Sequence, residues 1–416
     1  MTESTEVTFL IGKAETSPVS AQLTLADMYE NGYGIARDMG LAAQWYLQAA
    51  KQGSVPAQAN IGSKYLNGSG IDRNFEKAMY WLRLAAGRNN ANAIADIGWS
   101  IQEGLGVDKD INKAVQCYEK AAKLGHVSSK YNLGYIYANG LTGNTNQEEA
   151  FKNYLDAAKE GHQKAQLNIG LMCENGIGHK QDFIQAAEWY RKAADKNYDK
   201  AQFNLGRLYE QGEGVPRDYQ SAIMWYERAA DQGYYRAQYN LGLIFLNGKG
   251  VEKSIELAES YFLKASIRPY ARATYQLGKM YLTEDVSQTK KDQACEYLLE
   301  AADLNYFPAQ YMIGKLYLKG KTVQQDIDKA MEWINRAAIQ GYQPAQYKLG
   351  IIYKEGMAVE RNLCMAYAWL RIASIDENSA AVAACNEIRE LMSAKELEIS
   401  NDLYQELNEI TGTETS

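Results

Sequence analysis

Histidine is the side chain best suited to proton transfer and metal binding near neutral pH, and this chain has three: His126, His162 and His179. His126 and His162 each follow a glycine and occupy equivalent turns in the sequence. A metal site needs several ligands that converge to about 2 Å from the ion, and no cysteine or carboxylate cluster has the spacing to join either histidine. We therefore expect solvated turn histidines, no metal site and no catalytic residue.

Two short motifs resemble fragments of enzyme active sites. Ser287-Gln-Thr-Lys290 has the spacing of a serine nucleophile and its lysine, but it lies in a predicted loop without the Ser-Asp-Asn and Lys-Thr-Gly motifs that accompany such a pair. The Gly-x-Gly segments follow predicted helices rather than strands, so they lack the context of a dinucleotide site. The sequence thus predicts neither an enzyme nor a cofactor.

Charge and cysteine content narrow the class of protein. Net charge is −7, and residues 376–416 alone carry ten acidic and two basic residues, so the rest of the chain is near neutral and unlike a nucleic-acid binder. The five cysteines share no repeat position, which favours free thiols in a reducing compartment. The first residues, Met1-Thr-Glu-Ser-Thr-Glu, do not resemble a signal peptide, and no apolar run approaches the roughly 20 residues of a membrane span. We expect a cytoplasmic protein without membrane insertion, unless an export signal has been removed.

An alanine recurs every 36 residues and is followed, seven residues later, by a second alanine. The first alanines are Ala42, Ala78, Ala114, Ala150, Ala186, Ala222, Ala258, Ala294, Ala330 and Ala366. The second run from Ala49 to Ala373 at the same period. A fixed period of this length predicts a solenoid, in which each unit buries its apolar face against its neighbours.

Each unit reads as a pair of helices. In residues 201–236, apolar residues spaced by three and four predict a first helix that ends at Gly212, and Asp218 is the expected N-cap of a second helix. The equivalent glycines are Gly32, Gly68, Gly104, Gly140, Gly176, Gly248, Gly320 and Gly356, and the equivalent caps are Asp38, Asn74, Asp110, Asn146, Asp182, Ser254, Asp326 and Asn362. The eighth unit lacks both features in residues 282–292, which predicts either a bend or a differently closed loop there. Six tryptophans on the second helices, from Trp45 to Trp369, are expected in the core.

The pattern Ala-Gln-x-Asn-Leu-Gly, followed by the turn glycines, the acidic cap, Trp-Tyr and Ala-Ala, resembles the Sel-one-like repeat family, a relative of tetratricopeptide repeats. The resemblance implies an all-α fold, a right-handed α/α superhelical solenoid of about ten helix-pair repeats, with the first helices lining a concave surface. We expect a capping half-repeat in residues 1–20, ten repeats in residues 21–375 and acidic capping helices in residues 376–416. Residues 5–17 are the expected N-terminal capping helix.

The resemblance implies a non-enzymatic scaffold or adaptor that binds a protein segment in its groove. The alternative is a dedicated inhibitor, such as an immunity protein that neutralises one toxin. A remote alternative is a hydrolase, because some cysteine-rich relatives have been linked to penicillin binding.

Candidate binding residues lie at the fourth, seventh and eleventh positions of the first helix, counted from the alanine of Ala-Gln. Position four is rich in asparagine, which suits either a grip on a peptide backbone or a tie between repeats. Position seven begins with apolar residues and becomes basic, which predicts an acidic or amphipathic protein segment as partner, unless the next repeat covers these side chains. The predicted site comprises Asp96, Trp99, Glu103, Asn132, Tyr135, Asn168, Leu171, Asn204, Arg207, Asn240, Lys279, Lys315 and Lys319. The sequence does not indicate an oligomeric state.

Overall fold

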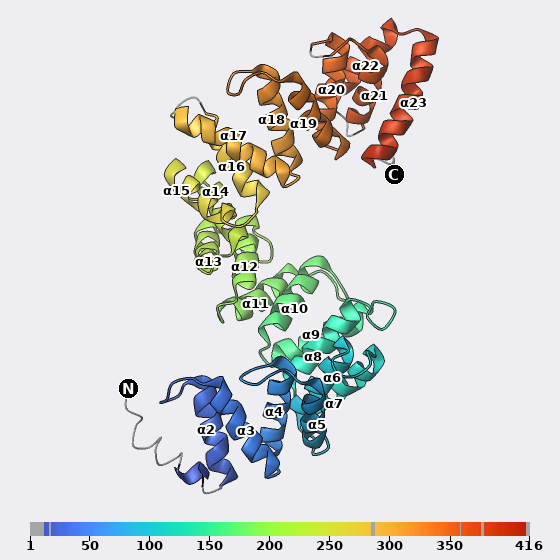
Figure 1. Ribbon diagram of the computed structural model, residues 1–416. Helices are drawn as coiled ribbons and strands as arrows, with labels where there is room; N and C mark the ends of the chain where they lie inside the picture. Colours follow the sequence, from blue (N-terminus) through green and yellow to red (C-terminus); the bar gives the residue numbers. More distant parts are fainter. Residues whose placement is uncertain (1–11, 16–17, 284–287, 358, 376–377, 413–416) are drawn as a thin grey trace. The chain divides into compact units, whose positions relative to one another are not determined.

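The computed structural model describes residues 12–15, 18–283, 288–357, 359–375 and 378–412, and every secondary-structure element in these ranges is a helix (Figure 1). The chain divides into two compact units, residues 1–217 and 218–416. Among the described residues, no helix is both long and apolar enough to cross a membrane.

Unit 1 contains the helices α2 (Val19–Asn31), α3 (Met39–Lys51), α4 (Val55–Asn67), α5 (Phe75–Ala86), α6 (Ala91–Glu103), α7 (Ile111–Lys123), α8 (Val127–Ala138), α9 (Gln147–Lys159), α10 (Gln163–Asn175), α11 (Phe183–Ala194) and α12 (Asp199–Gln211). Unit 2 contains α13 (Tyr219–Asp231), α14 (Tyr235–Asn247), α15 (Ile255–Ser266), α16 (Ala271–Tyr281), α17 (Gln288–Asp303), α18 (Phe307–Lys319), α19 (Ile327–Ile339), α20 (Gln343–Glu355), α21 (Leu363–Ala373), α22 (Ser379–Leu391) and α23 (Ala394–Thr411). Within each unit, consecutive helices pack on one another in the order of the sequence, except at the C-terminus, where α23 packs on α21. The predicted all-α helix-pair solenoid is confirmed.

Local sequence signals set the ends of the helices. Every predicted acidic, asparagine or serine cap precedes a second helix and accepts a backbone hydrogen bond, as Asp110 does from the Lys113 amide at 3.0 Å. These bonds satisfy amides that the first turn of a helix leaves unpaired. The turn glycines adopt positive φ, for example 76° at Gly104, a conformation that costs glycine little.

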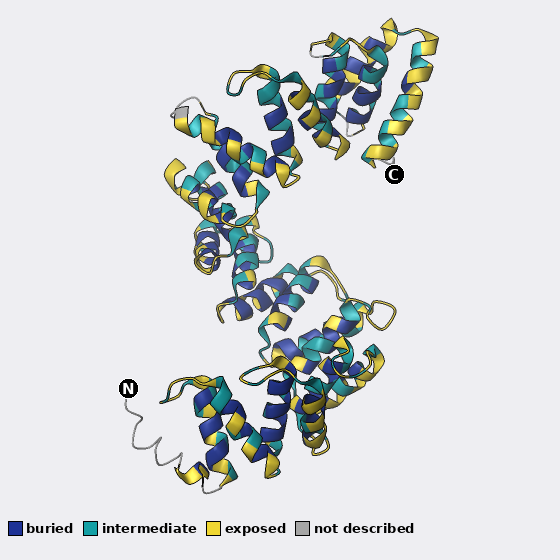
Figure 2. Cartoon of the chain, viewed as in Figure 1, coloured by how far each residue is buried: buried dark blue, intermediate teal, exposed yellow. Residues whose placement is uncertain are grey.

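The alanine columns lie at the centre of the helix packing in each repeat. All twenty alanines in the two predicted columns have no exposed surface. Small side chains there let helices approach closely, and buried aromatic residues such as Tyr118, Tyr190 and Tyr226 fill the remaining space. Of the six tryptophans predicted in the core, the four from Trp189 to Trp369 are buried, and Trp45 and Trp81 are half-buried against the core. Figure 2 shows buried residues along the packed helices and exposed residues in the loops and on helices such as α23.

In several repeats, a buried glutamine forms a hydrogen bond to the repeat before it. In the Ala-Gln motif, the glutamine Nε2 donates to the carbonyl oxygen of an alanine eight residues earlier, at the end of the preceding second helix. The pairs are Gln22–Ala14, Gln58–Ala50, Gln166–Ala158, Gln202–Ala194, Gln238–Ala230, Gln310–Ala302 and Gln346–Ala338, at 3.1–3.3 Å. Each bond gives the buried glutamine Nε2 an acceptor and adds a second hydrogen bond to a helix-end carbonyl, as at Ala338, which also accepts from the Gly341 amide at 3.0 Å.

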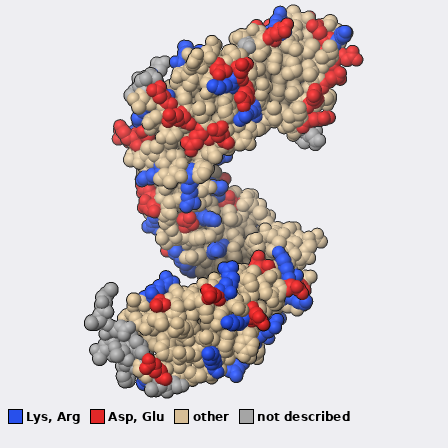
Figure 3. Space-filling view, viewed as in Figure 1, with Lys and Arg blue, Asp and Glu red and all other residues tan. Residues whose placement is uncertain are grey.

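The two ends of the chain have different amounts of described structure. Residues 5–11 and 16–17 of the predicted N-terminal capping helix lie outside the described residues, while Ala14 is buried and accepts the bond from Gln22. At the C-terminus, α22 and α23 occupy the ranges in which we expected capping helices, and α23 packs on α21 and α19. Figure 3 shows acidic side chains gathered over α23. The three-region division stays a prediction, as does a bend in the eighth repeat, where residues 284–287 lie outside the described structure.

Candidate protein-binding surface

The first helices of unit 1 expose two aromatic residues at the predicted seventh position. The Trp99 side chain on α6 and the Tyr135 side chain on α8 are 36 % and 44 % exposed, whereas Ile94 on α6 and Ile136 on α8 are buried. Leu171 on α10 is half-buried. The next repeat therefore leaves Trp99 and Tyr135 accessible, and their forming one strip with Leu171 stays a prediction.

The acidic residues beside Trp99 differ in their environments. Asp96 is half-buried one turn before Trp99, and burial raises its pKa to about 6, with a hydrogen bond from Ser63 of the preceding repeat acting in the opposite direction. Glu103, at the end of α6, is exposed and accepts a hydrogen bond from Gln102 Nε2 at 2.9 Å. The carboxyl group of Asp96 is thus partly protonated under mildly acidic conditions.

The asparagines at position four connect one repeat to the next. Asn240 Nδ2 donates to the hydroxyl of Tyr226, which lies on the preceding second helix, at 3.1 Å. Asn132 and Asn168 make the equivalent side-chain hydrogen bonds to Tyr118 and Tyr154. These amides tie the repeats together, which is the structural one of their two predicted roles. Asn204 is half-buried at the same position.

The basic residues of the predicted site fall into two groups. In unit 1, Arg207 forms an ion pair with both carboxylate oxygens of Glu174 from the preceding repeat, and Tyr190 donates to the same carboxylate at 2.8 Å. The expectation that Arg207 adds positive charge to the groove is therefore wrong, because Glu174 neutralises it. In unit 2, Lys279 and Lys319 are exposed and Lys315 is half-buried.

Unit 2 also contains an aromatic column that we did not predict. One tyrosine of each pair lies on a first helix, at the third position counted from the alanine of the Ala-Gln motif. The other tyrosine directly precedes the first helix of the next repeat. The ring pairs are Tyr239–Tyr270, Tyr275–Tyr306 and Tyr311–Tyr342, with centroids 5.4, 5.3 and 5.5 Å apart and nearly perpendicular or steeply tilted planes. All six rings are half-buried, so each keeps some surface for a ligand. The recurrence of tyrosine at these two repeat positions could have predicted the column from the sequence.

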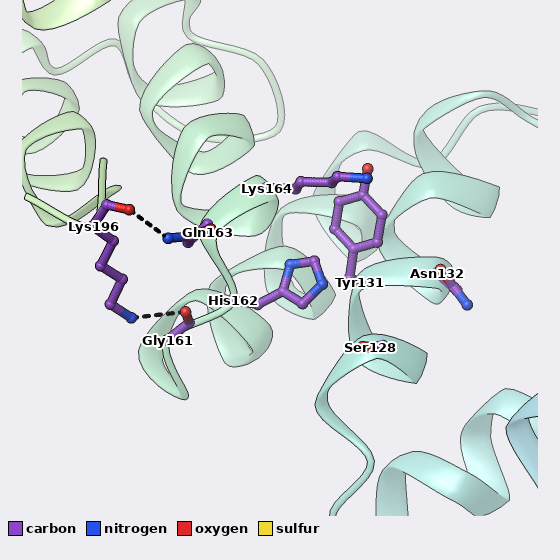
Figure 4. A pocket seen from close by; sticks show the side chains of 8 residues that line it. All are labelled: Ser128, Tyr131, Asn132, Gly161, His162, Gln163, Lys164 and Lys196. Carbon is purple, nitrogen blue, oxygen red and sulfur yellow. Dashed lines mark hydrogen bonds between the residues drawn. The ribbon is translucent and has the colours of Figure 1, made fainter. Parts of the chain in front are cut away.

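Unit 1 contains an aromatic pair of the same kind, which lines a hollow of about 620 Å³ (Figure 4). The Tyr131 ring stacks on the His162 ring, with centroids 4.6 Å apart and planes 23° apart. Asn132 and Lys164 also line the hollow, and Lys196 Nζ donates to the Gly161 carbonyl at 2.9 Å on its rim. The hollow thus combines an aromatic face with amide and ammonium groups.

The two turn histidines are helix caps rather than solvated side chains. The Nδ1 atoms of His126 and His162 accept from the backbone amides of Ser129 and Ala165, each at 3.2 Å, and both rings are half-buried. Burial lowers the pKa of both imidazoles. Our expectation of solvation was wrong because these residues occupy the position at which Ser54 and Asn90 cap other first helices.

The described residues contain no cluster of three or more histidine, cysteine or carboxylate side chains arranged to hold a metal ion. Ser287 of the predicted Ser-Lys pair lies outside the described residues. Lys290 of that pair forms an ion pair with Glu259 at 2.7 Å.

Comparison with known proteins gives a repeat family for nearly the whole chain. The model of the Sel1 repeat matches residues 19–54, 55–90, 91–126, 127–162, 163–198, 199–234, 236–268, 271–306, 308–342 and 343–375. A protective antigen of uropathogenic Escherichia coli with an SLR fold is 31 % identical, with a TM-score of 0.80 over 97 % of this chain and 95 % of that one. A Sel1 repeat protein from Oxalobacter formigenes is 30 % identical, with a TM-score of 0.49 over 59 % of this chain and 96 % of that one.

More distant structures include an immunity protein from Pseudomonas aeruginosa, which is 19 % identical with a TM-score of 0.34 over 51 % of this chain and 81 % of that one. This similarity carries no argument about function. Comparison with curated proteins found no match.

Proposed function

Because the chain belongs to the Sel1 repeat family, we propose that it is a non-enzymatic scaffold that binds a segment of another protein on its first helices. The exposure of Trp99 and Tyr135 is the observation that carries the proposal. Both are large aromatic residues at one repeat position, and neither is needed to fill the core. Aromatic residues of this kind dominate the binding energy of protein interfaces.

The composition of the surface indicates the class of partner. In unit 1 the first helices offer Trp99, Tyr135 and the Tyr131–His162 hollow, which suit apolar and aromatic side chains. In unit 2 they offer half-buried tyrosines together with Lys279, Lys315 and Lys319. An amphipathic segment with acidic residues complements both sets.

The thiols support a reducing compartment, and we propose the cytoplasm. All five cysteines are free, and three of them are buried. Burial raises the pKa of Cys173 and of Cys385 to about 11, so their thiols stay protonated at neutral pH.

A site-specific crosslinker tests the scaffold proposal. A photoreactive phenylalanine analogue in place of Tyr135 is expected to capture a protein partner in the native host, and the same analogue in place of Tyr80 is not. Tyr80 is a matched control because its side chain is 58 % exposed but lies on the second helix α5. Equal capture at both positions, or at neither, contradicts the proposal.

The affinity of the captured partner separates an adaptor from a dedicated inhibitor. An adaptor is expected to bind in about the micromolar range and an inhibitor in about the nanomolar range or tighter. A titration with the purified partner gives this number directly.

A further inference from the structure

Three lysines converge in unit 2 on a groove of about 480 Å³ that lies between α18 and α20. Lys315 and Lys319 lie one turn apart on α18, and Lys348 comes from α20. Lys315 and Lys348 are half-buried, and Lys319 is exposed. Leu318 and Met357 give the groove an apolar wall.

These lysines lack an internal counter-charge of the kind that Arg207 has at the position equivalent to Lys315. Arg207 occupies the position of Lys315 in its own repeat and pairs with Glu174, 33 residues earlier. The residue 33 positions before Lys315 is Leu282, which offers no charge. Over the part of the chain that the structure describes, none of the three lysines forms an ion pair with a carboxylate.

The clustering has an electrostatic cost in the free protein. Burial lowers the pKa of Lys315, and the charges of Lys319 and Lys348 act in the same direction. The Lys315 ammonium lies 5.1 Å from the centroid of the Tyr311 ring, which offsets only part of that repulsion. An anion bound in the groove would offset the repulsion among the three ammonium groups.

We propose that Lys315, Lys319 and Lys348 form a binding site for a phosphate monoester carried by a side chain of the bound protein segment. The source of the phosphate group rests on the proposed function, whereas the anion site itself does not. A single carboxylate would neutralise one of three ammonium groups. A phosphate monoester brings a charge of about −1.5 to −2 at neutral pH and three acceptor oxygens, which match three donors. Leu318 and Met357 then contact an apolar residue next to the phosphorylated one.

Inorganic phosphate tests the anion site without any partner. Thermal unfolding is measured in phosphate and in chloride at the same pH and ionic strength, because a ligand that binds only the folded state raises the unfolding temperature. Phosphate is expected to raise it for the native chain and for the control Lys253→Gln/Lys395→Gln, whose lysines are exposed elsewhere in unit 2. The increment is expected to vanish in Lys315→Gln/Lys348→Gln.

General salting effects act equally on all variants. An equal increment in all three proteins, or none in the native chain, overturns the site. The Lys315→Gln/Lys348→Gln variant is expected to fold, because it loses repulsion and no ion pair. A Lys315→Arg/Lys348→Arg variant retains the charges and is expected to retain the increment, so a folding defect and a binding defect are separable.

Synthetic peptides test the source of the phosphate group. Three labelled peptides are compared, identical except for phosphoserine, aspartate or serine between two leucines. The phosphoserine peptide is expected to bind at least tenfold tighter than the aspartate peptide, and Lys315→Gln/Lys348→Gln to remove that preference. Equal binding of the phosphoserine and aspartate peptides overturns the phosphoprotein assignment even if inorganic phosphate binds. Phosphate binding without any crosslinked partner contradicts the scaffold proposal and leaves the anion site standing.

Discussion

Gly134 marks a point where two helices of one repeat touch through the absence of a side chain. A Cβ atom added there would lie 2.6 Å from Cδ1 and 2.8 Å from Cε1 of Tyr154. The Tyr154 ring is only 4 % exposed and is hydrogen-bonded to Asn168, so it has little freedom to move. We predict that Gly134→Ala destabilises the protein.

The magnitude follows from two opposing effects. Overpacking of a filled core costs about 1–3 kcal/mol. Replacing glycine by alanine inside a helix recovers up to about 1 kcal/mol of helix propensity. Three ring carbons would lie within 3 Å of the new methyl group, so we place the overpacking cost in the upper half of its range and expect a net loss of about 1–2 kcal/mol.

The free energy of unfolding is measured by urea denaturation, with hydrogen exchange in α8 and α9 to locate the loss. Gly87→Ala is the matched control, because Gly87 has a right-handed helical conformation, is exposed, and a Cβ there meets nothing closer than 3.4 Å. It is expected to be neutral or to stabilise by up to about 1 kcal/mol. If Gly134→Ala is as stable as Gly87→Ala, the close packing of α8 on α9 is refuted.

Three further changes probe the repeat junctions, the binding surface and the pH response. Gln346→Met removes the 3.1 Å bond to the Ala338 carbonyl, which keeps its 3.0 Å bond from the Gly341 amide, and is expected to cost about 0.5–1.5 kcal/mol in urea denaturation, against nearly nothing for Gln405→Met on the exposed face of α23; equal costs would mean that the bond is unimportant. Trp99→Ala is expected to weaken partner binding about thirtyfold in a titration, since a hot spot contributes about 2 kcal/mol, while the melting temperature changes little; normal binding with a much lower melting temperature would place Trp99 in the core. Because burial lowers the pKa of folded His162 below that of the unfolded chain, its stabilising contribution is present above the unfolded pKa of about 6.5 and is lost as pH falls toward the folded value. Changing His162 to asparagine, the residue that caps α6 at the equivalent position 90, is expected to reduce the loss of stability between pH 7.5 and 5.5, and an unchanged pH slope would show that the imidazole does not contribute.

The features that we predicted correctly are local and repeated. A cap such as Asp110 and a turn glycine such as Gly104 act within a few residues of themselves, so one chain with many repeats displays the rule many times. The role of Arg207 was missed because its partner Glu174 lies in the preceding repeat, and the register between repeats depends on helix packing. The caps formed by the turn histidines could have been predicted, because Ser54 stands in the same column. The tyrosine column could also have been seen, but only packing shows that Tyr275 and Tyr306 meet.

The glutamine hydrogen bond between repeats has a consequence for how this chain can gain or lose whole repeats. Wherever this hydrogen bond occurs, a repeat supplies the glutamine amide donor near its start, and the repeat before it supplies the alanine carbonyl acceptor near its end. Such junctions are interchangeable, so recombination that deletes or duplicates whole repeats between them creates no new kind of interface. Junctions at which Ile94, Lys130 or Thr274 replaces the glutamine do not share this chemistry. Unequal crossing-over is therefore tolerated best between glutamine-bearing repeats. Each transferred repeat brings its own exposed residues, and so its own part of the binding surface, with it.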